Sequence, residues 1–138
     1  MKILIEFEPH FVNCAPMVKV YTSRDCCQMQ VATSTPYEIE LVCDPEDNLN
    51  IEFTNKSDIE DNWLELKKIE LDNINLQNFI FNGKFWPRYN ANWLEQQDPK
   101  PPTFYCPGTH MRHEGVWQLP IKLPIYRTVL DFWIDDER

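Results

Sequence analysis

The chain has 138 residues, a formal net charge of −9 at pH 7, 43% apolar residues and 13% aromatic residues. This length suits one compact domain and is too short for two, and the apolar share excludes a disordered chain. The acidic charge argues against a nucleic-acid-binding protein, which needs basic residues to replace phosphate counterions, and no apolar run is long enough to cross a membrane.

The first part of the chain alternates between apolar and polar residues with the period of two that is typical of strands. Glu6 and Glu8 interrupt the apolar residues of the N-terminal segment, which therefore predicts a strand and not a signal peptide. Turn residues separate the alternating segments, and two of these segments predict a hairpin across residues 23–25. The strands predicted here are residues 2–11, 17–22, 26–32, 37–43 and 49–54, with a turn at residues 44–48.

The next strand is predicted over residues 64–71, and its alternation contains an irregularity. Leu64 and Leu66 keep a period of two, and so do Ile69 and Leu71, but the spacing slips by one residue across Lys67 and Lys68. Such a slip predicts a β-bulge, where one extra residue re-aims part of a strand face.

A tight turn is predicted at Asp72-Asn73, and apolar residues then continue to a hairpin signal at Asn82-Gly83. Residues 90–115 contain four prolines and no sustained alternation, which predicts one long irregular excursion. The remaining strands are predicted at residues 74–81, 84–89, 116–123 and 126–134.

Nine or ten short strands, with no linker and no internal repeat, predict an all-β fold made of one domain over residues 1–138. We expect an antiparallel β-sandwich, jelly-roll-like, with one long proline-rich loop over residues 90–115. The five cysteines follow no disulfide framework, so we expect reduced thiols and synthesis in the cytoplasm.

An acidic connection lies between the strands predicted at residues 49–54 and 64–71, and its oxygen donors are Asn55, Asp58, Glu60 and Asp61. Calcium prefers six to eight such oxygens, so the connection can be read as a cation site. It can also be read as a solvated acidic turn. We favour the solvated turn, because the whole chain is acidic and short motifs often match by chance.

Aromatic residues gather in and next to the proline-rich excursion, and those we single out as a binding surface are Trp86, Tyr89, Trp93 and Tyr105. Interleaved with Asn and Gln, they can form a platform for sugar rings. They can equally anchor a protein–protein interface, or hold the excursion against the sandwich. We favour packing and protein contact together over sugar binding, because aromatic side chains are buried more often than they bind ligands.

Cys106, His110 and His113 have zinc-ligand chemistry, but the spacing fits no standard zinc finger and a fourth ligand is missing. We interpret them as ordinary loop residues. The chain also contains no Gly-x-Ser-x-Gly, no phosphate-binding glycine loop and no His-Glu-x-x-His. We therefore expect a protein that is not an enzyme.

The central stretch resembles the calcium-dependent xylan-binding carbohydrate-binding modules, which are β-sandwich jelly rolls. The resemblance rests on Phe53-Thr54-Asn55 at a strand end, on Glu60-Asp61-Asn62 in the acidic loop, and on the strand that comes after the loop, and it covers about half of the chain. Trp63 and the lack of an arginine in the loop depart from that pattern. The resemblance implies calcium in the acidic loop and polysaccharide as the ligand.

Two functions are expected from the sequence. The first is a structural or binding protein of a phage particle, such as a decoration or tail component, made without a signal peptide and assembled with copies of itself or with other virion proteins. The second is a calcium-dependent carbohydrate-binding module that recognises a polysaccharide. The first is favoured, on fold-level analogy.

Overall fold

Strands make up most of the protein. The computed structural model describes residues 1–54, 62–76, 80, 82–89, 91–112 and 114–122. The elements within these residues are β1 (Lys2–His10), β2 (Met17–Tyr21), β3 (Cys26–Gln30), β4 (Tyr37–Val42), β5 (Glu46–Thr54), β6 (Trp63–Leu71), β7 (Ile74–Asn75), β8 (Lys84–Pro87), α1 (Ala91–Glu95), β9 (His110–Met111) and β10 (Gly115–Lys122). The strand predicted at residues 126–134 lies outside the described residues.

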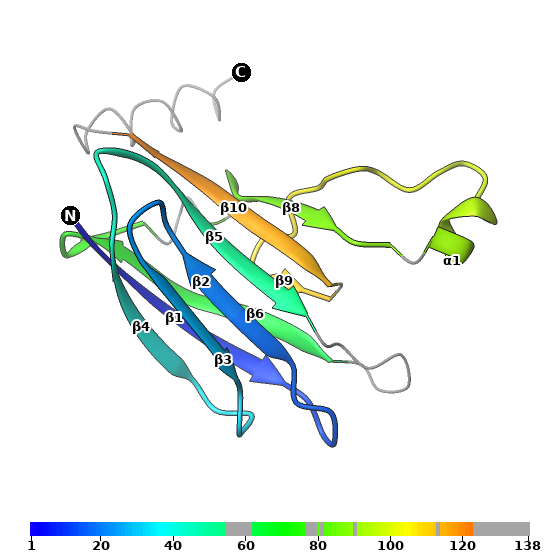
Figure 1. Cartoon of the computed structure of the whole chain (residues 1–138), viewed down its shortest axis with the longest axis horizontal. Coiled ribbons are helices and arrows are strands. Elements are labelled where there is room, and N and C mark those ends of the chain that lie inside the picture. Colours follow the sequence, from blue (N-terminus) through cyan, green and yellow to red (C-terminus); the bar gives the residue numbers. More distant parts are fainter. Residues whose placement is uncertain (55–61, 77–79, 81, 90, 113, 123–138) are drawn as a thin grey trace.

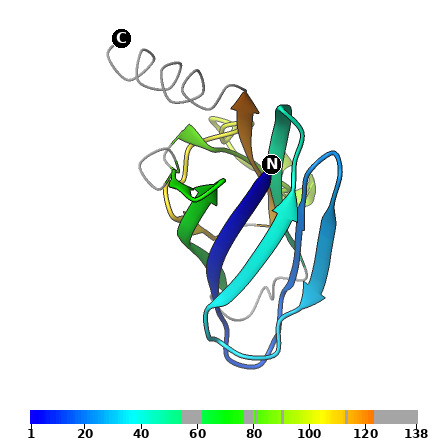
Figure 2. The same ribbon diagram turned by 90° about the vertical axis from the view of Figure 1, so that its left-hand side faces the viewer.

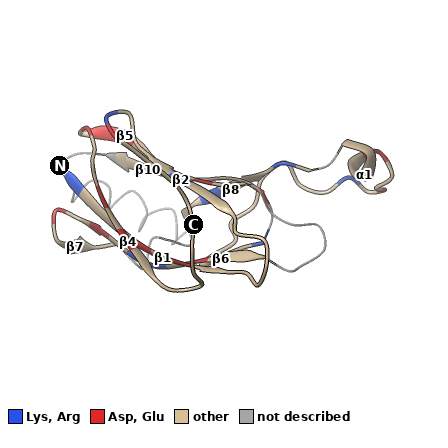
Figure 3. Cartoon of the chain, turned by 60° about the horizontal axis from the view of Figure 1, so that its bottom comes forward, with Lys and Arg blue, Asp and Glu red and all other residues tan. Residues whose placement is uncertain are grey.

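The strands form two antiparallel sheets that pack face to face (Figures 1 and 3). The first sheet has the order β4-β1-β6-β7, with β9 also paired to β6, and the second has the order β3-β2-β5-β10-β8. Figure 2 shows β1 and β4 on one side of the molecule and β2 and β3 on the other. The predicted all-β sandwich is therefore confirmed.

Alternation in each strand sends every second side chain into the space between the sheets. Ile3, Ile5 and Phe7 of β1 are fully buried, and Leu49, Ile51 and Phe53 of β5, in the opposite sheet, are too. Trp117 of β10 is among the largest fully buried side chains. The two sheets thus share one apolar interior, whose buried area is the main source of stability.

The predicted β-bulge is present in β6. Phe7 lies opposite Leu66 and Glu6 lies opposite Lys68, so Lys67 is an extra residue with no partner on β1. Because of this extra residue, Lys67 and Lys68 both lie toward the outer surface, while the apolar residues on both sides of them are buried.

The tight turn predicted between β6 and β7 is also present. Asp72 has φ 46° and Asn73 has φ 66°, and two consecutive residues with positive φ are characteristic of a type I′ hairpin turn. Asp and Asn tolerate this conformation better than other non-glycine residues.

The hairpin predicted at Asn82-Gly83 is wrong. β7 already ends at Asn75, and β7 and β8 belong to different sheets, so the two strands do not pair as the arms of a hairpin. The Gly83 N–H donates to the Ile80 carbonyl at 3.0 Å in a short turn. A Cβ at Gly83 would overlap the indole of Trp117, so the glycine is needed for close packing and not for a hairpin turn.

The proline-rich excursion predicted as irregular contains two short regular elements. α1 lies within it, and β9 pairs with β6, with Met111 opposite Leu64 and His110 opposite Glu65. Residues 88–89 and 91–104, which we call the arm, project beyond the end of the sandwich (Figure 1). Two backbone hydrogen bonds between Phe85 and Tyr105, of 2.7 and 3.0 Å, close the base of the arm.

The five cysteines form no disulfide. Cys26 is exposed and Cys27 packs against the core, as their opposite orientations in β3 require. No helix in the described part of the chain has the length and apolar character needed to span a membrane.

The turn predicted at residues 44–48 is shorter than expected, because β5 begins at Glu46. The Asp47 carboxylate accepts hydrogen bonds from the backbone N–H groups of Ser23 (3.0 Å), Asp44 (2.9 Å) and Asn48 (2.8 Å), and from the Ser23 hydroxyl (2.8 Å). This one side chain therefore connects the β2–β3 turn to the start of β5.

We expect Asp47→Asn to lower the free energy of unfolding by about 1 kcal/mol at neutral pH, because the amide nitrogen cannot accept these hydrogen bonds. Burial would raise the pKa of Asp47, but the hydrogen bonds from Asp44, Ser23 and Asn48 outweigh it and lower the pKa below its ordinary value of 3.8. The stabilisation is therefore complete above the ordinary pKa, and it disappears as pH falls through the lowered, folded-state pKa.

Urea unfolding of the wild type and Asp47→Asn at neutral and strongly acidic pH measures this difference. The two proteins should converge in stability at the acidic end. A difference that stayed constant across the whole pH range would contradict the role assigned to the Asp47 carboxylate.

Candidate functional site

The proposed calcium ligands Asn55, Asp58, Glu60 and Asp61 lie outside the described residues. The first described residue after them, Asn62, is fully buried. Its side-chain N–H donates to the Cys14 carbonyl at 2.7 Å, and its Oδ1 has no hydrogen-bond partner in the described part of the chain. Asn62 therefore fixes the start of β6 to the segment between β1 and β2.

Trp86 lies on the outer surface of β8 and is 40% exposed. Its ring packs against that of Phe104, with 4.8 Å between centroids, and Phe104 is itself 42% exposed. The Lys84 ammonium lies 5.1 Å from the centroid of the Phe104 ring, which is within the range of a cation–π contact. This pair forms an exposed aromatic surface where the arm leaves the sheet.

Tyr89 and Trp93 form a second aromatic pair inside the arm, with ring centroids 5.4 Å apart. The Tyr89 hydroxyl donates to the Pro102 carbonyl at 3.0 Å, and the Lys100 ammonium donates to the Leu94 carbonyl at 2.6 Å. These contacts tie the two sides of the arm together. They leave an open groove of about 560 Å³, whose lining includes Pro87, Tyr89, Leu94, Lys100, Pro101 and Pro102.

Tyr105 differs from the other three predicted aromatic residues. Its ring lies 5.5 Å from that of the buried Phe85, and it packs against the core. Burial raises the pKa of the Tyr105 phenol, and the nearby Tyr89 adds to the effect. Tyr105 therefore anchors the base of the arm, while Trp86 and Trp93 are exposed.

The Cys106, His110 and His113 group is only partly described, because His113 lies outside the described residues. Cys106 is exposed, and His110 belongs to β9. The His110 ring does not stand alone: it stacks on Trp63, with 4.8 Å between centroids and 19° between planes.

Trp63 is the centre of a surface cluster that the sequence alone did not predict. The His10 ring of β1 stacks on it at 3.8 Å and 10°. The Arg112 guanidinium lies 5.1 Å from the ring centroid. Because β1 and β9 pair with opposite edges of β6, the two histidines approach Trp63 from opposite sides.

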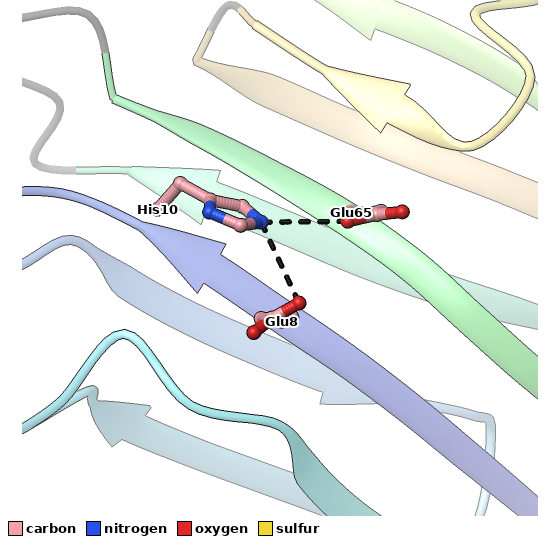
Figure 4. Close-up of side chains that lie close together, drawn as sticks. All are labelled: Glu8, His10 and Glu65. Atoms are coloured by element: carbon pink, nitrogen blue, oxygen red, sulfur yellow. Dashed lines mark hydrogen bonds and ion pairs between the residues drawn. The ribbon is translucent and has the colours of Figure 1, made fainter.

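Two carboxylates face His10 on the same outer surface of the first sheet (Figure 4). His10 Nε2 lies 3.4 Å from Glu65 Oε2 and 3.6 Å from Glu8 Oε2. Glu8 and Glu65 are directly opposite each other in the β1–β6 pairing. Like charges in such a pair repel, so the arrangement needs a cation nearby.

Lys67 supplies a positive charge to this pair. Its ammonium lies 3.3 Å from Glu8 Oε2 and 3.1 Å from Glu65 Oε2. The partial burial of Glu65 would raise the pKa of its carboxyl, but the hydrogen bonds from Lys67 and His10 lower it. The hydrogen bonds to Glu65 and Glu8 raise the pKa of Lys67 in turn. The Glu65 carboxylate is therefore held in the charged form.

The sequence contained part of this cluster. Glu8 and His10 share one face of a strand by the period of two, and so do Trp63, Glu65 and Lys67. The sequence did not indicate that β1 pairs with β6. The two strands are separated by many residues in the chain, and pairing partners are not encoded locally.

Comparison of the chain with protein-family models, with curated proteins and with solved structures gave no significant match. The resemblance to xylan-binding modules therefore stays an expectation that rests on residues 53–55 and 60–62 and on the strand after them. The function is inferred instead from the geometry of the described residues.

Proposed function

We propose that this protein is a structural or binding protein and not an enzyme, and that it contacts its partner through the arm and the exposed aromatic surface at the base of the arm. The single observation that carries this proposal is the exposure of three large aromatic side chains there, namely Trp86, Trp93 and Phe104. Exposed clusters of this kind mark interaction surfaces, because isolated domains gain nothing by leaving them in water.

The arm suits contact with a surface because it is already folded. The Phe85–Tyr105 backbone pair closes its base, and the hydrogen bonds of Tyr89 and Lys100 hold its two sides together. A preformed arm loses less conformational entropy on binding than a flexible loop does. Aromatic side chains are also the residues that most often dominate the energy of protein interfaces.

The setting we propose is a phage particle, in which the sandwich is a decoration or tail component. Jelly-roll β-sandwiches are frequent in viral shells. This part of the proposal is an analogy at the level of fold. We take a second copy of this chain as the partner to test, because repeated contacts between identical subunits build such particles.

The alternative function is polysaccharide binding, and the groove beside Tyr89 favours it. Sugar rings have apolar faces that stack on aromatic side chains, and the groove combines apolar proline and leucine side chains with the charged Lys100. Calcium in the acidic connection, at Asn55, Asp58, Glu60 and Asp61, belongs to this alternative.

Light scattering coupled to size-exclusion chromatography, over a concentration series, tests the two functions against each other. We expect the wild-type chain to self-associate, and the paired substitution Trp86→Ser/Trp93→Ser to raise the dissociation constant at least about 30-fold, as the loss of interface hot spots does. Ile74→Ser is the matched control, because Ile74 is 42% exposed but lies at the β6–β7 turn.

Chymotrypsin adds an independent measurement. Cleavage after Leu94, a site that both chains keep, should be slow in the oligomer and fast in the doubly substituted chain. A chain that stays monomeric at every concentration, yet is retarded in gels containing xylan or a bacterial polysaccharide with calcium, would contradict the structural proposal and support the alternative.

A further inference from the structure

We propose that Glu8, His10 and Glu65 form a binding site for a zinc ion on the outer surface of the first sheet. The three residues come from β1 and β6, and each offers one donor atom. The three donor atoms lie within 4.8 Å of one another, and Figure 4 shows the His10 ring directed toward both carboxylates. This site shares no residue with the acidic connection and does not depend on the proposed function.

The distances at His10 match those of a zinc site. Zinc binds nitrogen and carboxylate oxygen at roughly 2.0–2.2 Å, so neighbouring donors in a tetrahedral site are about 3.3–3.6 Å apart. His10 Nε2 lies 3.4 Å from Glu65 Oε2 and 3.6 Å from Glu8 Oε2. Two of the three edges of the ligand triangle therefore already have the length that zinc requires.

The kind of donor also selects the metal. One imidazole nitrogen and two carboxylate oxygens, with a fourth position open to water, are typical zinc ligands. Calcium and magnesium prefer oxygen donors alone and in larger number. The two opposed carboxylates, Glu8 and Glu65, supply negative charge that a dication neutralises.

Trp63 contributes to the site by orienting His10. The indole stacks on the imidazole at 3.8 Å and 10°, so the ring plane is fixed and Nε2 is directed along the sheet toward Glu8 and Glu65. A donor held in place before the metal arrives loses less entropy on binding. His110 also stacks on Trp63, at 4.8 Å, but it supplies none of the three donor atoms.

Lys67 competes with the metal. Its ammonium contacts the same two Oε2 atoms that zinc would use, at 3.3 and 3.1 Å. Zinc must therefore displace the ammonium, and the Lys67 side chain is partly exposed, so it can turn into solvent. The lysine keeps the two carboxylates together in the metal-free protein.

The experiment is a titration of the full chain with zinc chloride, under reducing conditions, followed by calorimetry and by nuclear magnetic resonance of the histidine rings. We expect one zinc ion per chain and a shift of the His10 Nε2 resonance. His10→Gln and Glu65→Gln should each weaken zinc binding by more than about 100-fold, which exceeds the usual effect of removing an outer-shell partner. Lys67→Met should strengthen it about fivefold, because the competing ammonium is gone.

His110→Gln is the matched control, since it makes the same chemical change on the opposite side of Trp63 and should leave zinc affinity within about threefold of the wild type. The test has three separate readouts, which are the zinc affinity of His10→Gln, the zinc affinity of Glu65→Gln and the His10 resonance of the wild type. It therefore remains decisive even if one variant fails to fold. Zinc binding that is equal in wild type and His10→Gln, or that shifts no His10 resonance, would place the metal on the cysteines and overturn the proposal.

Discussion

Replacing Gly83 by alanine should lower the free energy of unfolding by about 3 kcal/mol, the upper range for overpacking a well-filled core. The added methyl group would overlap Cε2, Cζ2 and Nε1 of Trp117, which is fully buried between the sheets and cannot move aside. Urea unfolding, followed by circular dichroism, measures the loss.

A double-mutant cycle identifies the cause of that loss. Trp117→Phe removes the second ring of the indole, and it breaks no hydrogen bond, because Trp117 Nε1 has no partner in the described part of the chain. In the Trp117→Phe background, we expect the loss of unfolding free energy caused by Gly83→Ala to be smaller by more than about 1 kcal/mol. Equal costs in both backgrounds would mean that Gly83 is needed for a backbone conformation, as the hairpin interpretation of Asn82-Gly83 requires.

Two single-residue deletions in β6 should have opposite outcomes. Deletion of Lys67 removes the residue that has no partner on β1, so Phe7 stays opposite Leu66 and Glu6 stays opposite Lys68. The shortened strand then alternates without interruption. We expect this variant to fold, with a stability within about 2 kcal/mol of the wild type.

Deletion of Glu65 should prevent folding. It moves Leu64 and Trp63 by one position relative to Leu66, and a slip of one residue exchanges the inner and outer faces of a strand. Leu64, which is fully buried in the wild type, would be directed to solvent, and the partly buried Trp63 would be directed into the core. Circular dichroism and thermal unfolding of both deletions provide the comparison. A folded Glu65 deletion, or an unfolded Lys67 deletion, would contradict the register of β1 and β6.

Two features of the fold, the bulge in β6 and the turn after it, are determined by residues that are close together in the chain. The bulge can be predicted from the spacing of Leu66 and Ile69 alone. The two residues are three positions apart, whereas residues on one face of a regular strand are an even number of positions apart, so a strand can bury both only if it contains one extra residue between them. The turn at Asp72-Asn73 is local for the same reason, since Asp and Asn tolerate the positive φ that it needs.

Asn82-Gly83 is the counterexample. The dipeptide has the composition of a hairpin turn, yet its glycine is explained by Trp117, a residue that is distant in the chain. Nothing within the segment itself indicates that β7 and β8 belong to different sheets. Local preference was overridden by packing between the layers, which a single sequence does not display.

In the arm and in the Trp63 cluster, too, some features could be predicted from the sequence and others appear only in the structure. The sequence indicated that Trp86, Tyr89, Trp93 and Tyr105 belong together in a proline-rich region. Only the structure separated Tyr105, which packs against Phe85, from the exposed tryptophans. Cys106, His110 and His113 form a short motif in the sequence, whereas His110 in fact stacks on Trp63, which also contacts His10.

By itself, the sequence determined the all-β class, most strand positions and the bulge, because side-chain alternation is a property of a few neighbouring residues. The tertiary structure decided which strands pair, and therefore that Glu8 meets Glu65 and that His10 meets Trp63. Strand pairing depends on contacts between residues far apart in the chain, and their free energy appears only when the two sheets close over a shared core.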